Sequence, residues 1–323
     1  MGNILLRHVK KISLYPTSPF SFENTVYKPS HFPISTSLYK SGKFIFATCF
    51  EGIPIGIELI DKGTIECPHI ECGVYSQEDL DESFLEKVKR EIIWRFDMDA
   101  DLDKFNRMAE KDTLLSPVLG RRRGMRIMTT HSLYEYIIVV FLLQNATIRR
   151  TVQMMEALID HYGYKVEFNG TELSCIWHPT RLLCVDEQEL RELKVGYRAK
   201  FIKRLSDEFC NRGINEQVLR KCSKEDLKKK LLSLYGIGKQ SVWYIMFEVF
   251  HFYDALETIS PWEQKIYSRL IYKKELVDSE KIMKRATRTW GKWKMLALHY
   301  LFEDLFWRRQ GGEETWLDDL IKL

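Results

Sequence analysis

The segment most able to do chemistry is Leu234–Ile245, which reads Leu-Tyr-Gly-Ile-Gly-Lys-Gln-Ser-Val-Trp-Tyr-Ile. Gly236 and Gly238 flank one apolar residue directly before an apolar helical run. Glycine supplies the positive φ that a tight turn requires. The helix after the turn presents unpaired N–H groups and a positive dipole end, which suit a phosphate. The pattern is typical of a helix-hairpin-helix that grips a nucleic-acid backbone. An ordinary corner between two helices is the alternative that these residues alone leave open.

A basic segment leads into this hairpin. Residues 191–230 contain 13 Lys or Arg against 6 Asp or Glu, whereas the whole chain has a net charge of only +4. The low overall charge excludes a polycation that coats nucleic acid without discrimination. A solvated helix face is the ordinary explanation of such a run. Its position beside a phosphate-binding turn favours a surface that faces DNA.

Size and composition set the class of protein. A chain of 323 residues with 45% hydrophobic residues can form two or three domains with a sizeable core, which excludes wholesale disorder. The 7 cysteines are scattered, and we find no signal peptide and no membrane-spanning apolar run. We therefore expect a soluble protein of a reducing compartment, either the cytoplasm and nucleoid or the nucleus of a eukaryote. Cys67 and Cys72 lack a second ligand pair at zinc-finger spacing, so no metal site is expected.

The chain changes from strand to helix character along its length. Residues 1–75 are β-rich, with strands predicted over 43–50 and 53–60 around a Glu51-Gly52 turn. A helix is predicted over 86–94, and Pro117 with the run 119–124 indicates a linker or loop. From there the chain is expected to be helical nearly to its end. The predicted helices cover residues 133–143, 149–162, 186–193, 199–209, 224–232, 266–271, 281–290 and 293–307.

Six segments, in order along the chain, carry a resemblance to a known family. They are Arg95–Phe105, Arg122–Arg126, Leu142–Thr147, Gly196–Lys200, the hairpin and Trp290–Ala297. Together they make residues 95–307 similar to the helix-hairpin-helix (HhH-GPD) DNA glycosylase superfamily, in the branch of 3-methyladenine glycosylase II and the 8-oxoguanine glycosylases. Residues 1–90 match that family in character only, as a small β-rich domain.

The resemblance implies an α+β fold. A small N-terminal β-rich α/β domain (1–90) would precede a helical core (91–323), whose two subdomains flank a DNA-binding cleft that includes the hairpin 234–245. It implies a monomer that acts in base excision repair on double-stranded DNA with a damaged base and has no contact with a membrane. The base, an alkylated or oxidised purine, would be flipped out of the stack and hydrolysed from its sugar. No cofactor is required, and a monovalent cation held by backbone carbonyls at the hairpin fits the family.

The resemblance also assigns a catalytic carboxylate. Cleavage of a glycosidic C–N bond gives the sugar oxocarbenium character, which a nearby carboxylate stabilises. The family places an Asp at the start of a helix after the hairpin, with an Ile or Val three residues later. Here Glu263 and Ile266 take these positions. Glu is one methylene longer than the Asp of the family. Three outcomes are therefore possible: a pocket rebuilt around Glu263, slow activity, or loss of activity. In the alternative interpretation Glu263 only caps the helix after Pro261, and Asp254 is the fallback acid.

Lyase chemistry is not expected. Bifunctional members of the family carry a lysine two residues after the second hairpin glycine, where its amine attacks the sugar. Gln240 occupies that position. Lys239 is one residue early and would point about 100° away on a helix. We therefore predict a monofunctional glycosylase.

Further residues are assigned by the same resemblance. Asn145, with Gln144 as second choice, would fill the gap left by the flipped base, unless these residues merely hold their turn. Predicted DNA-backbone contacts are Gly236, Gly238, Lys239, Gln240, Arg149 and Lys200. Predicted walls of the base pocket are Trp262, Trp243, Tyr197 and Trp290, although most tryptophans of a helical core fill space. The competing hypothesis is a non-catalytic DNA-binding protein on the same scaffold, a sensor of lesions or DNA structure.

Overall fold

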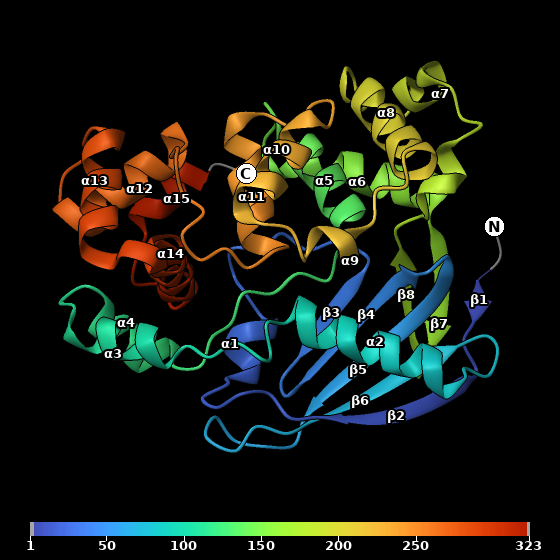
Figure 1. Cartoon of the computed structure of the whole chain (residues 1–323), viewed down its shortest axis with the longest axis horizontal. Coiled ribbons are helices and arrows are strands. Elements are labelled where there is room, and N and C mark those ends of the chain that lie inside the picture. The colour runs from blue at the N-terminus through green and yellow to red at the C-terminus, as the bar shows by residue number, and fades with distance from the viewer. Residues whose placement is uncertain (1–2, 322–323) are drawn as a thin grey trace.

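The computed structural model describes residues 3–321 and has an antiparallel sheet below a largely helical region (Figure 1). The expected α+β class is confirmed. The main sheet has the strand order β2-β6-β5-β4-β3. Its strands are β2 (His8–Leu14), β3 (Ser37–Lys40), β4 (Lys43–Phe50), β5 (Ile53–Asp61) and β6 (Ile70–Ser76). The predicted hairpin joins β4 to β5, and Glu51 and Gly52 both have positive φ, as a tight two-residue turn requires.

One face of this sheet is covered by helix α2 (Glu82–Arg95). Asp81 caps the helix by accepting a hydrogen bond from the Phe84 N–H. Leu85, Val88 and Ile92 lie one helical turn apart and pack into the same core as the strands. The helix predicted over 86–94 is therefore present with longer bounds. Because α2 continues past residue 90, it links the sheet rigidly to the helical region.

A second, small sheet corrects the expectation that the chain is helical after residue 124. Strand β1 (Ile4–Leu5) pairs in parallel with β7 (Tyr164–Phe168), which forms a hairpin with β8 (Thr171–Cys175). The turn between them is Asn169-Gly170, with positive φ at both residues. Phe168 approaches the first sheet so closely that a Cβ on Gly56 would lie 2.5 Å from its ring. Alternating buried residues and an Asn-Gly turn were the signals of this hairpin in the sequence.

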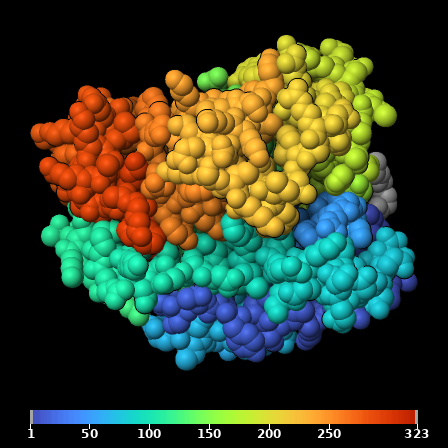
Figure 2. Space-filling model, in the orientation of Figure 1, coloured from blue at the N-terminus to red at the C-terminus, as the bar shows by residue number. Residues whose placement is uncertain are grey.

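Most other elements of the described chain are α-helices. They are α1 (Phe22–Val26), α3 (Asp103–Lys111), α4 (Leu115–Arg122), α5 (Leu133–Leu143), α6 (Ile148–Tyr162), α7 (Glu187–Glu192), α8 (Arg198–Asn211), α9 (Glu216–Leu219), α10 (Lys224–Ser233), α11 (Lys239–Glu248), α12 (Pro261–Tyr272), α13 (Ser279–Trp290), α14 (Lys294–Gln310) and α15 (Trp316–Ile321). No helix among residues 3–321 combines the length and apolarity needed to cross a membrane. Figure 2 shows the C-terminal helices, from yellow to red, lying over the teal and blue N-terminal part.

Helices α5 and α4 differ in how well the sequence predicted them. Helix α5 has the predicted bounds, is buried along most of its length, and begins with a capping box of Ser132 and Glu135. The loop expected around Pro117 is wrong, because α4 occupies this segment. Pro117 lies in the first turn of α4, where its missing N–H would have no helical partner. The helix is held by Arg121 and Arg122, which pair with the buried Asp304 of α14.

A buried ion cluster joins α2 to the helical region. The Glu91 carboxylate accepts hydrogen bonds from Arg95 (Nε, 2.8 Å) and from Arg220 (Nη2, 2.7 Å, and Nη1, 2.9 Å). All three side chains are buried. Burial acts to raise the pKa of Glu91, but the two guanidinium groups outweigh it and hold this pKa at about 2. Arg220, a member of the basic segment, therefore serves the fold and does not face DNA.

Candidate active site and nucleic-acid interface

The hairpin between α10 and α11 has the geometry of a phosphate-binding turn. Gly236 has a φ of +91°, and a Cβ placed on it would lie 3.0 Å from the rings of Phe141 and Phe201. Gly238 has an extended backbone and stands at the N-cap of α11, where no side chain caps the helix. The first N–H groups of α11 are thus free of a capping side chain, and an anion can bind to them.

These two glycines give a matched pair of variants. Gly236→Ala is expected to lower the free energy of unfolding by about 1–3 kcal/mol, because alanine is strained at positive φ and its Cβ crowds two aromatic rings. At Gly238 the φ is negative and the space around a Cβ is open, so Gly238→Ala should cost less than about 1 kcal/mol, the penalty of alanine at an N-cap. Urea unfolding measures both. Equal stability of the two variants would contradict the described turn.

The turn between α5 and α6 lies against the hairpin. The Gln144 side-chain amide donates to the Gly236 carbonyl (3.1 Å), so Gln144 holds the loop and is not available for insertion into DNA. Asn145 is exposed at the tip with a φ of +49°, and its amide donates to the Tyr197 hydroxyl (3.3 Å). Tyr197 is 42% exposed and belongs to this tip. The structure thus brings together Asn145, Gln144, Tyr197 and Gly236 on one side of the molecule.

The predicted backbone contacts are only partly available to DNA. Lys239 and Gln240 are exposed in the first turn of α11, and Arg149 is exposed near the start of α6. Lys200 lies over the ring of Tyr235, next to Gly236, with its Nζ 5.6 Å from the ring centroid. In contrast, Arg198 is buried and donates to the Phe141 carbonyl (3.0 Å). Some side chains of the basic segment, such as Arg198, therefore stabilise the fold, and others, such as Lys200, lie around the hairpin.

Glu263 lies in the first turn of α12, where it completes a capping box with Ser260. Its Oε2 accepts hydrogen bonds from the Ser260 N–H (3.0 Å), from the Ser260 hydroxyl (2.7 Å) and from the Tyr244 hydroxyl. Its Oε1 accepts no hydrogen bond from residues 3–321. The carboxylate is half-buried. The capping interpretation is thus present in the structure, and it leaves one carboxylate oxygen unengaged.

The tryptophans predicted to wall a base pocket are largely structural. Trp243 is 4% and Trp290 is 2% exposed, and both pack in the helical core, so neither can contact a flipped base. Trp290 also donates its indole N–H to Asp112 (3.1 Å). Trp262 is 36% exposed but packs on Phe302 of α14 and donates to the Leu320 carbonyl. Large aromatic side chains fill the volume between helices here. The base-pocket assignments of Trp243 and Trp290 are therefore wrong, whereas those of Trp262 and Tyr197 stay predictions.

The fallback acid is likewise engaged elsewhere. The Asp254 carboxylate forms an ion pair with Lys224 (2.6 Å) in the segment after α11. This ion pair joins the segment after α11 to the start of α10.

Buried polar contacts that sequence reasoning missed join the segment after α1 to α14. Lys28 Nζ lies 3.3 Å from His299 Nε2, and the Ser30 hydroxyl donates a hydrogen bond to Glu303 (2.7 Å). Burial and the charges of Glu263 and Glu303 raise the pKa of Tyr267 of α12. Ionisable residues inside otherwise apolar helices, such as Glu248 and His299, were the available signal.

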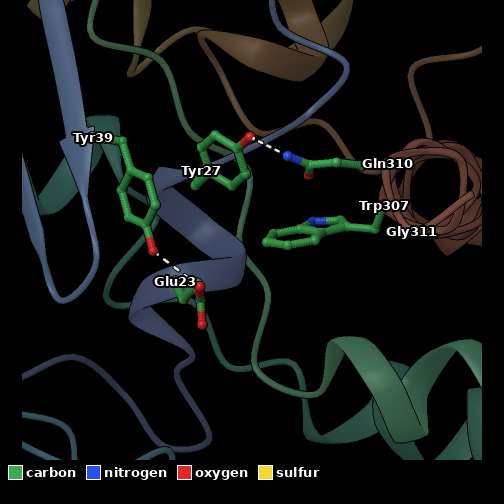
Figure 3. Close-up of a pocket in the computed structure, with 6 residues that line it drawn as sticks. All are labelled: Glu23, Tyr27, Tyr39, Trp307, Gln310 and Gly311. Atoms are coloured by element: carbon green, nitrogen blue, oxygen red, sulfur yellow. Dashed lines mark hydrogen bonds between the residues drawn. The ribbon is translucent and has the colours of Figure 1, made fainter.

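A surface hollow of about 620 Å³ lies elsewhere, at the seam between the sheet region and the end of α14 (Figure 3). It is lined by Glu23, Tyr27, Tyr39, Trp307, Gln310 and Gly311. Gln310 donates to the Tyr27 hydroxyl (2.8 Å), and the Tyr39 hydroxyl donates to Glu23 (2.9 Å). None of the predicted site residues lines this hollow. The hydrogen bond between Gln310 and Tyr27 crosses the seam and joins the two parts of the molecule, whereas the Trp307 indole N–H has no hydrogen-bond partner among the described residues.

The expected monovalent cation would be held by backbone carbonyls of the hairpin. The Leu234 carbonyl accepts from the Ile237 N–H (3.2 Å), and the Gly236 carbonyl accepts from Gln144. A carbonyl has two lone pairs, so each oxygen could hold a cation only through the second. A cation at the hairpin therefore stays a proposal, and no step below depends on it.

Comparison with known proteins bears on the fold of the chain. No family model matches the sequence. A DNA-3-methyladenine glycosylase of Bacillus subtilis (strain 168) is 22% identical over 240 residues, which are 69% of this chain and 75% of that protein. Among solved structures, a 3-methyladenine DNA-glycosylase from Archaeoglobus fulgidus has a TM-score of 0.75 at 18% identity, covering 90% of this chain and 97% of that one.

The chain therefore has the same fold as this solved DNA glycosylase. The Clostridium acetobutylicum 8-oxoguanine glycosylase/lyase, solved with double-stranded DNA containing cytosine opposite 8-oxoguanine, has a TM-score of 0.68 at 18% identity and covers 95% of this chain and 99% of that one. The parts of this chain that align with the two solved structures include the N-terminal sheet. The resemblance that the sequence showed only from residue 95 onward thus extends over the whole glycosylase fold.

Proposed function

We propose that the protein is a DNA N-glycosylase of base excision repair. It hydrolyses the bond between the sugar and a flipped, damaged purine, with Glu263 as the catalytic carboxylate. The observation that carries this proposal is the Glu263 carboxylate, fixed through Oε2 while Oε1 stays unengaged. A carboxylate held rigidly in this way stabilises positive charge on the sugar and can orient the attacking water.

The hairpin supplies the grip on DNA in this proposal. A phosphate binds the N–H groups at the start of α11, and Lys239 and Arg149 add sequence-independent contacts with the backbone. Asn145, exposed on the neighbouring tip, enters the stack in place of the flipped base. The first turn of helix α11 binds the phosphate, and Tyr244 of the same helix donates a hydrogen bond to Glu263. One rigid helix therefore sets the distance between the bound phosphate and the carboxylate. The proposed partner is double-stranded DNA with a damaged base, bound by a monomer in the compartment that holds the genome.

The proposal specifies hydrolysis without strand cleavage. Gln240 stands where a lyase would carry its amine, and an amide cannot form a Schiff base. Incubation with abasic DNA and borohydride should therefore give no trapped protein–DNA adduct. An adduct that forms with the wild type and disappears in Lys239→Ala would show that this part of the proposal is wrong.

The function is tested with duplexes that each carry one damaged base. Abasic sites are detected as alkali-labile breaks, with cleavage before alkali reporting lyase activity. We expect release of at least one modified purine and no break before alkali. A second candidate function, the non-catalytic sensor, is favoured by one observation, the engagement of Glu263 as a helix cap. Tight lesion binding without release from any duplex of a broad panel would establish the sensor and reject the enzyme.

A further inference from the structure

Helix α13 carries a row of positive side chains on its outer side. Lys281, Arg285 and Arg288 follow one another at intervals of four and three residues, which places them within about 60° of one another around the helix axis. Lys281 and Arg288 are exposed and Arg285 is half-buried, whereas Ile282 and Ala286 on the inner side are buried in the helical core. Lys281, Arg285 and Arg288 are named the α13 stripe below.

The charge of the α13 stripe is not neutralised by the protein. None of its three side chains forms an ion pair with an acid of residues 3–321. The acids nearest in the sequence are engaged elsewhere, because Glu280 pairs with Lys284 (2.8 Å) and Glu275 pairs with Arg269 (3.4 Å). Asp278 caps the helix by accepting a hydrogen bond from the first turn. The α13 stripe therefore faces the solvent as uncompensated positive charge.

Tyr272, the last residue of α12, holds part of the α13 stripe in place. Its ring centroid lies 5.6 Å from Lys281 Nζ and 5.1 Å from Arg285 Cζ. Arg285 also donates to the Ile271 carbonyl (3.4 Å), and the Tyr272 hydroxyl donates to the Lys281 carbonyl (3.2 Å). An aromatic ring attracts a cation without cancelling its charge, as a carboxylate would. The cations are thus oriented before a partner binds, which lowers the entropy cost of binding.

The basic segment 191–230 differs from the α13 stripe in this respect. Many of its cations form ion pairs with carboxylates of the protein, namely Arg191, Lys203, Arg212, Arg220, Lys224 and Lys228. Much of the positive charge that the sequence shows before the hairpin is therefore offset within the fold. The α13 stripe has a smaller number of cations, but all of their charge remains available to a partner.

Helix α12 connects the α13 stripe to the candidate active site. Glu263 in the first turn of α12 accepts a hydrogen bond from Tyr244 of α11, and Tyr272 at the other end of α12 contacts the stripe. Figure 1 shows α13 beyond α12, on the side away from α11. From Glu263 to Tyr272 the helix rises about 14 Å. This length equals about four base pairs of a duplex, so the hairpin and the stripe can contact one DNA molecule.

A nucleic-acid duplex is the polyanion that the α13 stripe fits best. The stripe extends about 10 Å along α13, and a DNA duplex presents about six negative charges over that length. A membrane surface is also anionic, but an interfacial helix needs an exposed apolar face beside its charges. The inner residues Ile282 and Ala286 of α13 are buried, so this helix has no such face.

We propose that the α13 stripe is a second contact surface for the phosphate backbone of duplex DNA, separate from the hairpin. It binds the DNA that flanks the damaged base. This inference rests on the proposed function for the identity of the partner. Contacts with phosphates depend on salt and carry no sequence information, so the stripe adds affinity for any duplex and no preference for a lesion.

The test measures the affinity of the full chain for an undamaged, fluorescent duplex of about 30 base pairs over a range of salt concentrations. The variant Lys281→Gln/Arg285→Gln/Arg288→Gln should bind this duplex at least about tenfold more weakly than the wild type at about 0.1 M salt. The slope of log affinity against log salt should become shallower by about 2–3, because each phosphate contact contributes about 0.9 to it. Thermal unfolding of the same samples reports whether the variant is folded.

A matched control removes the same charge from another surface. Lys10→Gln/Lys11→Gln/Lys87→Gln replaces three lysines of β2 and α2 that form exposed ion pairs, and it should change duplex affinity by less than about threefold. An equal loss of affinity in both triple variants would reduce the effect to net charge and overturn the inference.

A second variant keeps the test valid if the triple variant fails to fold. Lys281→Gln/Arg288→Gln changes only exposed side chains and keeps the contacts of Arg285 with α12. Its salt slope should become shallower by about 1–2. An unchanged slope in either folded variant would overturn the inference. Vesicles that contain phosphatidylserine test the other partner. Binding to them that the stripe variants lose, while duplex binding stays unchanged, would assign the stripe to membranes and reject the inference.

The outcome is separable from that of the proposed function, because the duplex is undamaged and only binding is measured. Release of a damaged base by the wild type, together with an unchanged salt slope in the stripe variants, rejects the inference and keeps the glycosylase. A salt slope that depends on the stripe, without release from any duplex of the lesion panel, keeps the inference and rejects the enzyme.

Discussion

Glu263→Gln is expected to slow base release at least about 100-fold, because a neutral amide cannot stabilise the charge that develops on the sugar. The fold should be nearly unaffected. Glutamine also serves at this position of a capping box and keeps an acceptor for the Ser260 N–H and the Tyr244 hydroxyl. The measurement is single-turnover release of the base that the wild type removes, with thermal unfolding on the same samples.

Ser260→Ala is the matched control for Glu263→Gln. It removes the capping hydroxyl, which is worth about 1 kcal/mol, but keeps the carboxylate and its hydrogen bond from Tyr244. Its rate should fall much less than that of Glu263→Gln, and its stability should fall more. If Glu263→Gln retains the wild-type rate, Glu263 is a helix cap only, and catalysis belongs to another residue.

Glu91→Ala is expected to lower the free energy of unfolding by about 3–5 kcal/mol, because it leaves Arg95 and Arg220 buried without their carboxylate. Urea unfolding at neutral pH measures this loss. Lys87→Ala, which breaks an exposed ion pair with Glu51, should cost less than about 1 kcal/mol. A similar, small cost for both variants would contradict the structural role of the buried cluster.

The same carboxylate sets a pH dependence. The pKa of Glu91 lies at about 2 in the folded protein, below the ordinary value of 4.5. Its contribution to stability is therefore fully present above pH 4.5 and is lost as the pH falls from 4.5 toward 2. The difference in unfolding free energy between wild type and Glu91→Gln should shrink over that range. A difference that stays constant down to pH 2 would show that the carboxylate does not titrate as described.

The features that could be predicted from the sequence are local ones. The β4–β5 hairpin, helix α5 and the hairpin before α11 depend on turn residues and periodicity within a few positions. The capping alternative for Glu263 could also be predicted, because Pro261 lies two residues before it. The features that were missed depend on contacts between distant residues. Lys28 and His299 are 271 positions apart, and no pattern near either one indicates that they meet.

The failed assignments have the same physical origin. Tryptophan type does not tell whether a ring faces a substrate or fills the space between helices, and packing decided this for Trp243 and Trp290. The β7–β8 hairpin was overlooked because its strands are short and come directly after a strong helix. It is stabilised by residues of the N-terminal sheet, far away in the sequence.

The small sheet of β1, β7 and β8 determines how the protein can be divided. A cut of the chain near residue 90 would separate its strands, because β1 lies before the cut and β7 and β8 lie after it. The core of this sheet includes Ile45 of β4 together with Val166 and Phe168 of β7. A fragment that ends after α2 would expose that apolar face, and one that begins there would leave the free edge of β7 open to pairing with other chains. Truncated forms are therefore expected to aggregate, and only the intact polypeptide is suited to biochemical work.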